Sequence, residues 1–457
     1  MSHPHCSIVP PFILEALAAG DDDLARRARV TLDHDRSFRS QRAPGLRPQG
    51  IVGRPRPARG DGGQPHRSVH DAEQSTALPG TLVRGEGQGA HADRAVNEAY
   101  DGLGHTWRLF WEHLGRDSLD GRGLGLVATV HYGRQYVNAF WDGQQMVFGD
   151  GDGEVFGPFT ASLDVIAHEL AHGVTQYTSG LHYADQSGAL NEHVSDVFGA
   201  VVKQFALGQS AEEADWLIGA ELLLPGVEGV ALRSMAAPGT AYDDPRLGTD
   251  PQPGHMDDFV DTTDDYGGVH INSGIPNKAF HLVATSLGGP SWLAPAQIWY
   301  DVITGDIRAD CDFATFADLT MAAASDRFGA TSPEADAVRA AWAAVGVTAP
   351  APSSPQPDGA DEVDGLASTI EVRRTGGFAG TTRRRTVDVA DLPQPDADRW
   401  RSLLATGTLT AWALDAPAHP DSFSYGVRCP EPRVDVSLPE RSLPEDVRAL
   451  FERTLES

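Results

Sequence analysis

The feature that most constrains this chain is a pair of histidines set four residues apart within a helical pattern. Residues 161–175 read ASLDVIAHELAHGVT, and their apolar side chains recur at three- and four-residue steps, which predicts a helix with one buried face. Residues four apart lie above one another on a helix, so His168 and His172 can reach a single cation. Glu169, one step round the helix, can reach a water on that cation without being a ligand. This spacing therefore predicts a metal-binding helix.

The next segment supplies a third candidate ligand. Residues 187–198 read SGALNEHVSDVF and predict a second helix that places Glu192 and Asp196 on one face. Two imidazoles and one carboxylate leave the fourth tetrahedral position of zinc open for water, as a catalytic zinc site requires. Asp196 can accept the remaining N–H of a ligand imidazole and so fix its tautomer. The combination indicates a zinc peptidase. A packed histidine pair and an exposed Glu192 remain the alternatives at this point.

The charge of the chain argues against several classes of partner. Acidic residues outnumber basic ones by 64 to 36 in the 457 residues, and most of the excess falls in residues 68–347. Such a surface repels nucleic acid and anionic membranes, and no apolar run is long enough to span a bilayer. Residues 1–20 lack a basic start followed by an apolar stretch, and the three cysteines form no pair spacing. We therefore expect a cytoplasmic protein without nucleic-acid or membrane partners; leaderless export stays open.

Two stretches rich in proline, glycine and charged residues divide the chain. Residues 44–67 and 348–367 have almost no periodic apolar residues, which is typical of exposed linkers. They separate a head of residues 1–43, a central block of residues 68–347 and a tail of residues 368–457. Each part is within or below the usual size of a domain.

Four motifs of the central block resemble the thermolysin family of zinc metalloendopeptidases, and within it the protealysin-like branch. They read SVHDA from Ser68, HYGRQYVNAFWDGQQMVFGDGDG from His131, HELAHGVTQYTSGLHYADQSGALNEHVSD from His168, and DDYGGVHINSGIPNKAF from Asp264. The resemblance implies an α+β fold in which the two-lobed catalytic domain has a strand-rich amino-terminal half and a helical carboxy-terminal half. The zinc helix would lie between the two halves.

The same resemblance implies roles for individual residues. His168, His172 and Glu192 would bind zinc, and Glu169 would polarise the metal-bound water and pass its proton to the leaving nitrogen. The other implied members of the centre are the oxyanion-stabilising His270 and Tyr183, the acid Asp265 that orients His270, and the supporting residues Asp196 and Asn191.

Substrate contacts are also implied. Asn138 and Ala139 correspond to an edge strand that pairs with an extended substrate, and Arg233 to the arginine that holds the carbonyl just past the cut. The selectivity pocket would be lined by Phe156, Phe159, Val165 and Leu232. Because all four are apolar, we expect cleavage on the amino side of bulky hydrophobic residues.

One departure from the family concerns calcium. In relatives with a paired calcium site, several carboxylates surround the position of Asp164, whereas here the matching positions hold Lys203, Leu217 and Ala220. Calcium needs about six to eight oxygen ligands, so we expect the paired site to be lost and the Lys203 ammonium to neutralise Asp164. Whether another calcium site survives stays open.

The head and the tail suggest regulation. The head has Pro10 and Pro11 before an amphipathic turn, and the sequence predicts a second helix after it. The head resembles a protealysin-type propeptide that covers the cleft. A simple folding aid is the alternative role of the head, and a Cys6 thiolate on the zinc is a minor alternative for its action. The tail predicts a β-hairpin at residues 369–389 and helices at 396–405 and 444–455, and through IEVRRTGGFAG it resembles emfourin, an inhibitor of such peptidases.

Two functions from different classes follow. The first is an active endopeptidase acting on proteins or peptides, with its own propeptide and its own C-terminal domain as intramolecular inhibitors. The second is a weakly active or inactive zinc domain that serves as a protease-binding, inhibitory regulator. Intact Glu169 and His270 favour the first.

Overall fold

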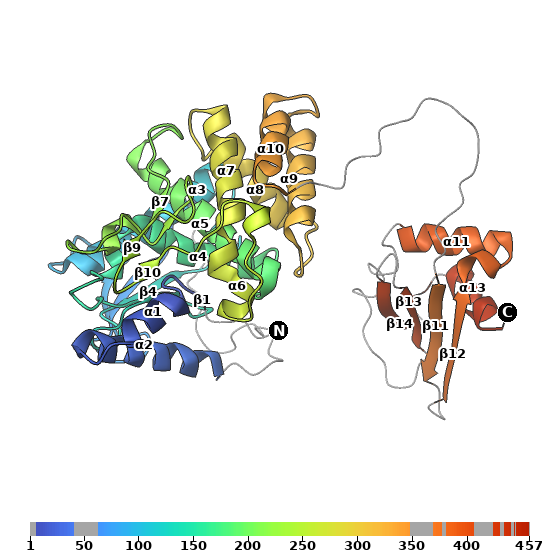
Figure 1. Ribbon diagram of the computed structural model, residues 1–457, viewed down its shortest axis with the longest axis horizontal. Coiled ribbons are helices and arrows are strands. Elements are labelled where there is room, and N and C mark those ends of the chain that lie inside the picture. Colours follow the sequence, from blue (N-terminus) through green and yellow to red (C-terminus); the bar gives the residue numbers. More distant parts are fainter. Residues whose placement is uncertain are drawn as a thin grey trace. The chain divides into compact units, whose positions relative to one another are not determined.

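The fold is that of a computed structural model of the chain, which describes residues 6–40, 63–347, 369–376, 381–405, 424–429, 434–439, 443 and 445–456. The chain forms two compact units, Met1–Ser354 and Pro355–Ser457 (Figure 1). Most of the first predicted linker and the whole of the second lie outside the described residues. The first unit contains every residue assigned above to metal, catalysis or substrate.

The amino-terminal half of the first unit is built on a mixed six-stranded sheet in the order β1-β5-β6-β4-β2-β3. The strands are β1 (Cys6–Ser7), β2 (Arg67–Asp71), β3 (Thr81–Gly85), β4 (Leu126–Val130), β5 (Ala139–Trp141) and β6 (Met146–Phe148). Parallel pairs join β2 to β4 and β4 to β6, while β1 and β5 are antiparallel. All side chains of β5 and β6 are buried, as expected for strands covered on both faces.

The head contributes β1 and two helices, α1 (Pro11–Ala18) and α2 (Asp23–Ser40). A proline at the first turn of α1 costs no hydrogen bond, because the N–H it lacks has no partner inside a helix. Ile13, Leu14 and Leu17 form the buried stripe of α1 and join the core of the first unit. The predicted second helix of the head is therefore present, and the head packs as part of one hydrophobic core.

Three long helices connect the sheet with the helical half. They are α3 (Arg94–Leu114), α4 (Leu163–Tyr177) and α5 (Asp185–Leu207), and Figure 1 shows α4 and α5 between the strands and the helices α7 to α10. The first two residues predicted for the α4 helix lie before it, because a 3₁₀ turn at Phe159–Ala161 precedes it. The two helices approach closely at Gly199, where an added Cβ would lie 2.7 Å from the Asp164 carbonyl oxygen.

The helical half comprises α6 (Asp265–Asn272), α7 (Gly274–Leu287), α8 (Ala294–Thr304), α9 (Phe313–Phe328) and α10 (Pro333–Ala344), with short strand pairs β7–β8 and β9–β10 before them. Those strands are β7 (Leu217–Ile218), β8 (Arg233–Ser234), β9 (Asp243–Asp244) and β10 (Gly248–Thr249). Trp299 and Trp342 stack at 6.3 Å in its core. The predicted division into a strand-rich half and a helical half is confirmed.

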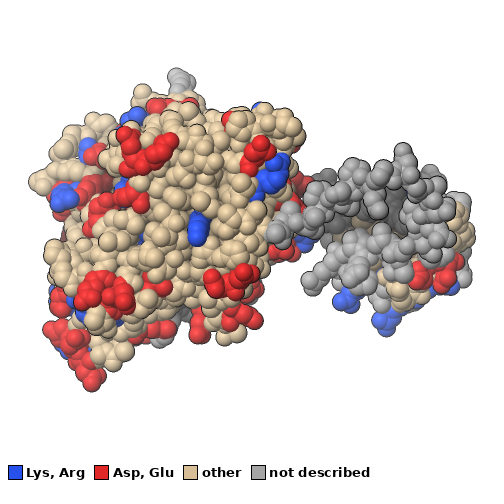
Figure 2. All heavy atoms as spheres, turned by 45° about the horizontal axis from the view of Figure 1, so that its top comes forward, with Lys and Arg blue, Asp and Glu red and all other residues tan. Residues whose placement is uncertain are grey.

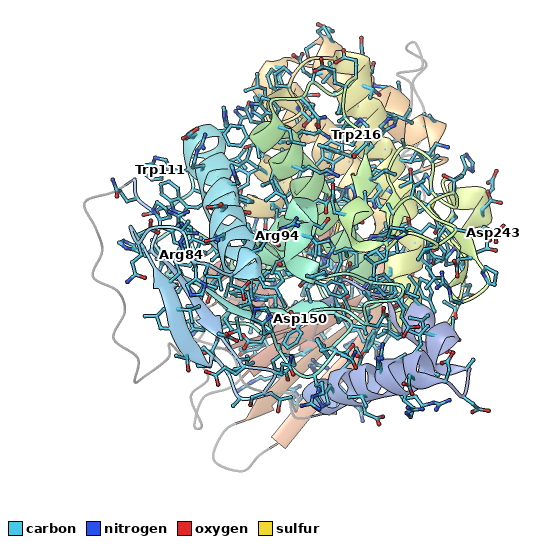
Figure 3. All side chains as sticks on the ribbon, turned by 90° about the vertical axis from the view of Figure 1, so that its left-hand side faces the viewer. Arg84, Arg94, Trp111, Asp150, Trp216 and Asp243 are labelled. Carbon is cyan, nitrogen blue, oxygen red and sulfur yellow. The ribbon has the colours of Figure 1, made fainter. Side chains whose placement is uncertain are left out.

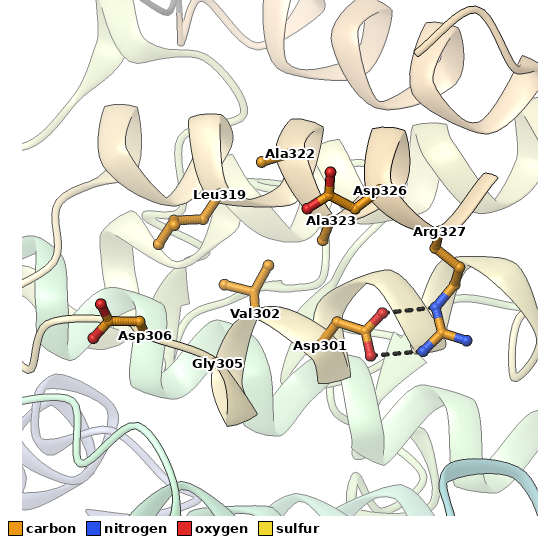
Figure 4. Close-up of a pocket in the computed structure, with 9 residues that line it drawn as sticks. All are labelled: Asp301, Val302, Gly305, Asp306, Leu319, Ala322, Ala323, Asp326 and Arg327. Atoms are coloured by element: carbon orange, nitrogen blue, oxygen red, sulfur yellow. Dashed lines mark hydrogen bonds and ion pairs between the residues drawn. The ribbon is translucent and has the colours of Figure 1, made fainter. Parts of the chain in front are cut away.

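A shallow concavity of about 470 Å³ lies between α8 and α9 (Figure 4). Val302 and Leu319 contribute apolar side chains, and Asp301 and Arg327 form a two-pronged ion pair at one end. None of the predicted site residues lines it. It therefore adds nothing to the candidate site described below.

The second unit has a four-stranded antiparallel sheet in the order β12-β11-β13-β14. Its elements are β11 (Thr369–Gly376), β12 (Thr381–Asp388), α11 (Gln394–Ala405), β13 (Ser424–Cys429), β14 (Val434–Pro439) and α13 (Glu445–Glu456). Buried side chains of the helices and of the sheet form one core, in which the Trp400 and Phe451 rings are in contact. The predicted hairpin, both predicted helices and the small α+β architecture are confirmed.

Acidic side chains are spread over the visible face of the first unit in Figure 2, in keeping with the net charge of −28. Among the described helices, none combines the length and the apolar character that crossing a membrane requires.

Candidate metal and catalytic site

The packing of α4 against α5 brings three of the predicted ligands together. Single ligand atoms of His168, His172 and Glu192 all lie within 4.8 Å of one another, and the three side chains are buried. The Nε2 atoms of His168 and His172 are 3.1 Å apart, and the Glu192 carboxylate lies 3.4 Å and 3.5 Å from them. One turn of α4 thus brings the two imidazoles together, and α5 adds a carboxylate beside them.

The hydrogen bonds behind this cluster decide where its protons lie. His168 Nδ1 is 2.8 Å from the Asp196 carboxylate, which can only accept, so Nδ1 carries the hydrogen. His172 Nδ1 donates to Asn191 Oδ1 at 2.9 Å, an orientation fixed because Asn191 Nδ2 donates to the Leu181 carbonyl. In the neutral rings both Nε2 atoms then present lone pairs to each other.

Burial also leaves polar atoms of the centre unsatisfied. Glu192 Oε2 has no hydrogen-bond partner among the described residues. Burial works against charge on His168, but the nearby Asp196 and Glu192 carboxylates outweigh that effect and raise its pKa to about 9, whereas burial lowers the pKa of His172 to about 4. Two facing nitrogen lone pairs and an orphaned carboxylate oxygen fit a divalent cation with nitrogen and oxygen ligands.

Glu169 lies beside this cluster on the sheet side of α4. Its Oε2 accepts a hydrogen bond of 2.9 Å from the backbone N–H of Trp141 in β5, and its Oε1 is buried without a partner among the described residues. Complete burial raises the pKa of Glu169 well above its usual range. A carboxylate held at one oxygen and open at the other can exchange a proton with a molecule in the cleft.

The loop and first turn of α6 bring in the remaining predicted catalytic residues. Asp265 accepts the His270 backbone N–H at 2.8 Å and its Nδ1–H at 2.7 Å, so the ring is oriented with Nε2 toward the cleft. Burial opposes charge on His270, yet Asp265 and Glu192 raise its pKa. Tyr183 donates to Glu192, and its oxygen lies 3.2 Å from His270 Nε2. The structure therefore gathers these residues around one point.

Asp196 is the centre of a buried network larger than the sequence indicated. It receives two bonds from the Arg233 guanidinium, at 2.8 Å and 2.9 Å, and one of 2.9 Å from Asn277 Nδ2. Burial would raise the pKa of Asp196, but Arg233 and His168 hold it well below the usual range. Asn277 also contacts His193 on the opposite side. Sequence reasoning missed Asn277 and His193. The only sign in the sequence was that each is a polar residue among the apolar residues of its helix.

The head runs along the edge strand that was predicted to bind substrate. Cys6 and Ser7 pair with β5, and Ile8 N donates to the Ala139 carbonyl at 3.2 Å. Val9 N donates to Asn138 Oδ1 at 2.9 Å. The backbone of the head thus makes the contacts with β5 that an added strand makes.

Two side chains of the centre hold carbonyls of the head. Arg233 Nη1 donates to the Ile8 carbonyl at 3.2 Å, and His270 Nε2 lies 3.2 Å from the Ser7 carbonyl oxygen. In the segment just before β5, Tyr136 and Asn138 donate hydrogen bonds to Asp35 of α2. The head is therefore anchored at both its strand and its helices. The side chain of Cys6 lies outside the described residues.

The predicted pocket residues are all buried in the core of the first unit. They are Phe156, Phe159, Val165 and Leu232, and the first two rings lie 6.0 Å apart. Ile8 is also fully buried in that core. With the head in place, the structure shows these residues as packed core.

Lys203 is on α5, and its side chain lies between α4 and the loop after α5, at the other end of the helix pair from the histidines. Its ammonium is 3.0 Å from Asp164, 3.2 Å from Asp215 and 3.4 Å from Glu221. Opposing burial, the three carboxylates raise the pKa of Lys203. The expected neutralisation of Asp164 is therefore seen, but Asp215 and Glu221 were not anticipated as partners. Ser162 joins the cluster by donating to Asp164.

Known families match most of the chain. Residues 61–176 match "Thermolysin metallopeptidase, catalytic domain", residues 179–347 match "Thermolysin metallopeptidase, alpha-helical domain" and residues 372–455 match "Emfourin". The chain is 53% identical over 348 residues to an extracellular metalloprotease of Pectobacterium carotovorum subsp. carotovorum, covering 76% of this chain and 97% of the relative. It is 43% identical over 287 residues to an extracellular minor metalloprotease of Serratia marcescens, covering 62% and 78%.

A solved structure shares the fold of the first unit. The precursor of protealysin, a metalloproteinase from Serratia proteamaculans, superposes with a TM-score of 0.68 at 50% sequence identity, covering 75% of this chain and all of that one. The resemblance to the protealysin-like branch, the two-lobed fold and the emfourin-like tail are confirmed.

The prediction of a cytoplasmic protein is wrong by the same comparison, because two of these relatives are named extracellular. It rested on residues 1–20, and most of the described part of that stretch forms β1 and α1 of the folded head. Those residues therefore carry the pattern of a packed segment and do not report on location.

Proposed function

Since this chain belongs to the thermolysin family of metallopeptidases, we propose that it is a zinc-dependent endopeptidase made as a precursor and acting outside the cell. One observation carries the zinc centre. The Nε2 lone pairs of His168 and His172 converge beside an unpartnered oxygen of Glu192 in a buried site. Without a metal ion, only a proton on His168 relieves the opposed lone pairs, and the carboxylate oxygen stays unsatisfied, which is costly in a buried site.

His168, His172 and Glu192 would hold the ion. When bound, zinc supplies Lewis acidity, which polarises a peptide carbonyl and makes water a nucleophile near neutral pH. Asp196 and Asn191 keep the hydrogens of both imidazoles on Nδ1, so the opposite nitrogens stay free for the ion.

The proton transfers fall to Glu169. Its Oε2 is fixed by Trp141, while Oε1 is free to take the proton of the attacking water and to return it to the leaving nitrogen. Burial raises the pKa of Glu169, which makes its carboxylate a stronger base for the proton of the water than a carboxylate in solvent. His270 and Tyr183 would donate to the developing oxyanion, since both side chains converge where the head places its Ser7 carbonyl.

We propose cleavage on the amino side of bulky hydrophobic residues. The head supports this direction, because Arg233 holds the carbonyl of Ile8 and the Ile8 side chain is fully buried in an apolar core. A substrate bound in the same register would bury its corresponding side chain against Phe156, Phe159, Val165 and Leu232.

Residues 1–43 would act as a propeptide, and the linker of residues 44–67 would be the processing region. The bonds from Ala139, Asn138, Arg233 and His270 to residues 7–9 support this proposal, since substrate would need the same groups. The tail, residues 368–457 after the linker 348–367, would inhibit a peptidase cleft in the manner suggested by its emfourin match. The inactive-regulator alternative is less well supported, because Glu169 and His270 are both present beside the cluster of His168, His172 and Glu192.

The zinc proposal is tested by elemental analysis of the purified chain together with hydrolysis of quenched peptides. We expect about one zinc per chain and activity that appears once the head is cut away. Glu169→Gln should retain zinc and lose about 10²- to 10⁴-fold in kcat. Glu112→Gln, at an exposed glutamate of α3, is the matched control and should behave as wild type. Folded protein without zinc, or an active Glu169→Gln, would refute the proposal.

The tail proposal needs a separate truncation. A chain ending at Ser354 keeps the whole first unit and should be more active than the full chain after the same head removal. Equal activity of the two forms would refute inhibition by the tail.

A further inference from the structure

The chain reverses its handedness just before His270. Four consecutive residues, Asp265 to Gly268, have positive φ values of 49°, 54°, 88° and 73°. Glycine adopts this region freely, and a short polar side chain such as that of Asp265 is tolerated there. A tyrosine at position 266 is not tolerated in the same way, because a bulky residue at φ of 54° is strained.

The turn itself does not need the tyrosine. Asp265 holds both nitrogens of His270 that face it, and Gly267 packs so closely on Asp185 that an added Cβ would lie 2.3 Å from its carboxylate. Both features come from the neighbours of Tyr266. Glycine or asparagine at position 266 would form the same turn with less strain, so the ring has to be explained by what it contacts.

The Tyr266 ring lies at the edge of the catalytic group. It meets the Tyr183 ring edge-on at 5.9 Å, and Tyr183 in turn lies 3.2 Å from His270 Nε2. The side chain of Tyr266 is 37% exposed, whereas Tyr183 and His270 are buried. An exposed ring packed on Tyr183, which itself lies beside His270, forms part of the wall of the cleft.

The head shows which side of the cut this wall adjoins. His270 faces the Ser7 carbonyl oxygen, while Arg233 holds the next carbonyl, that of Ile8. A substrate in this register would have its acyl side at Ser7 and its amine side at Ile8. Tyr266 borders the His270 and Tyr183 end, which is the acyl side.

We propose that Tyr266 determines specificity on the acyl side of the scissile bond, where its ring favours bulky apolar or aromatic substrate side chains. The inference rests on the proposed peptidase activity. Ring-to-ring contact prefers edge-on or offset geometry, and the half-exposed face of Tyr266 offers such contact at a position separate from the pocket of the amine side.

The test uses the zinc-loaded full chain, activated by limited proteolysis of its head, and two series of quenched peptides. One series varies the acyl-side residue between phenylalanine and alanine, and the other varies the amine-side residue between leucine and alanine. We expect Tyr266→Asn to lower the acyl-side kcat/KM ratio by about 10-fold and to leave the amine-side ratio unchanged, since a hydrophobic contact is worth about 10- to 200-fold. Tyr266→Phe should keep the wild-type ratio. Tyr177→Asn, at a tyrosine that is 39% exposed at the end of α4, is the matched control and should keep both ratios.

A second readout is independent of activity. Tyr266→Gly should raise the Tm of the zinc-free full chain by about 2 °C or more, because it relieves the left-handed strain, while lowering acyl-side selectivity. An unchanged acyl-side ratio in Tyr266→Asn, or a change in the amine-side ratio instead, would overturn the assignment. A wild-type chain that hydrolyses neither series, even when it ends at Ser354 and so lacks the tail, would instead overturn the proposed function, so the two failures are distinguishable.

Discussion

Two clusters of opposite charges lie between α4 and α5, and they solve the same electrostatic problem in different ways. At one end, His168, His172 and Glu192 bring single ligand atoms within 4.8 Å of one another. At the other end, Lys203 places its own ammonium among Asp164 and two further carboxylates. The first cluster has an orphaned oxygen and facing lone pairs, whereas the second has its cation covalently attached.

This difference separates activity from stability. A cation that belongs to the chain is present as soon as the chain folds, so the Lys203 cluster stabilises the fold without any ion. A cation that must come from solution leaves an open coordination position, which is what chemistry requires. A change at the histidine end of the α4–α5 pair should therefore reduce activity, and a change at the Lys203 end should reduce stability. Each end can be altered without the other.

Metal removal should have the largest effect. Treatment with a strong zinc chelator should abolish peptide hydrolysis, and added zinc should restore it, because the three ligands cannot polarise a carbonyl by themselves. The stripped chain should keep its far-UV circular dichroism, since Lys203 needs no ion to neutralise Asp164. Unfolding of the stripped chain at room temperature would contradict the separation of the two ends.

Lys203→Ala tests the other end. Removing the ammonium leaves buried Asp164 uncompensated beside Asp215 and Glu221, and breaking a buried pair costs about 3–5 kcal/mol. We expect the free energy of unfolding, measured by urea titration, to fall by that amount while the zinc content stays at wild-type level. Lys278→Ala, at a half-buried lysine of α7, is the control. A variant as stable as wild type would show that the cluster contributes no stability.

Two substitutions, Asp196→Asn and Asn191→Ala, compare how much each hydrogen-bond acceptor of the two imidazoles contributes to metal affinity. Asp196 is a charged acceptor for His168, and Asn191 is a neutral acceptor for His172. Loss of such a support costs about 10- to 100-fold in metal affinity, and charged hydrogen bonds are roughly twice as strong as neutral ones. Zinc competition assays should therefore show the larger loss for Asp196→Asn. The reverse order would argue that tautomer control matters more at His172.

A third cluster, nearer to solvent, gives the smallest expected effect. His131 lies 2.9 Å from Asp93 and 2.8 Å from Asp150, which is labelled in Figure 3. The hydrogen bond to Asp150 raises the pKa of His131 to about 9 against burial. A raised folded-state pKa means that the stabilisation is complete below about pH 6.5, declines as the pH rises and is lost above about pH 9.

We expect that His131→Gln lowers the Tm at pH 6 and that the difference from wild type closes by pH 9.5. Solvent screening should limit the stability difference at pH 6 to about 1 kcal/mol. A difference that is constant across this range would show that the imidazole acts by packing and not by charge.

The sequence predicted what depends on local periodicity. The spacing of His168, Glu169 and His172 is set by one helix, and Asp196 follows Glu192 on the next, so helical geometry alone placed them. The contact of His270 with Ser7 joins residues 263 positions apart, and no periodic pattern marks it. The family resemblance identified His270 as a residue of the cleft, but it did not show that the Ser7 carbonyl of the head lies beside it.

Other parts of the site could not be predicted because their partners converge from loops. Asp215 lies in a loop after α5 and Glu221 in a short 3₁₀ helix, where the sequence shows only an exposed acid pattern. The strain at Tyr266 is likewise a backbone property, visible as a φ value and not as a residue type. Tertiary packing, and not local propensity, determines both the positions of these two acids and the backbone conformation of Tyr266.

The strand β1 is hydrogen-bonded to β5 and is linked to the rest of the first unit by the chain itself. A tethered competitor has an effective concentration in the cleft of the order of millimolar, and this value does not change when the protein is diluted. A single cut in the tether converts it into an ordinary dissolved peptide, whose occupancy falls with dilution. Latency would then be a property of chain connectivity, and secretion into a large volume would make the release one-way.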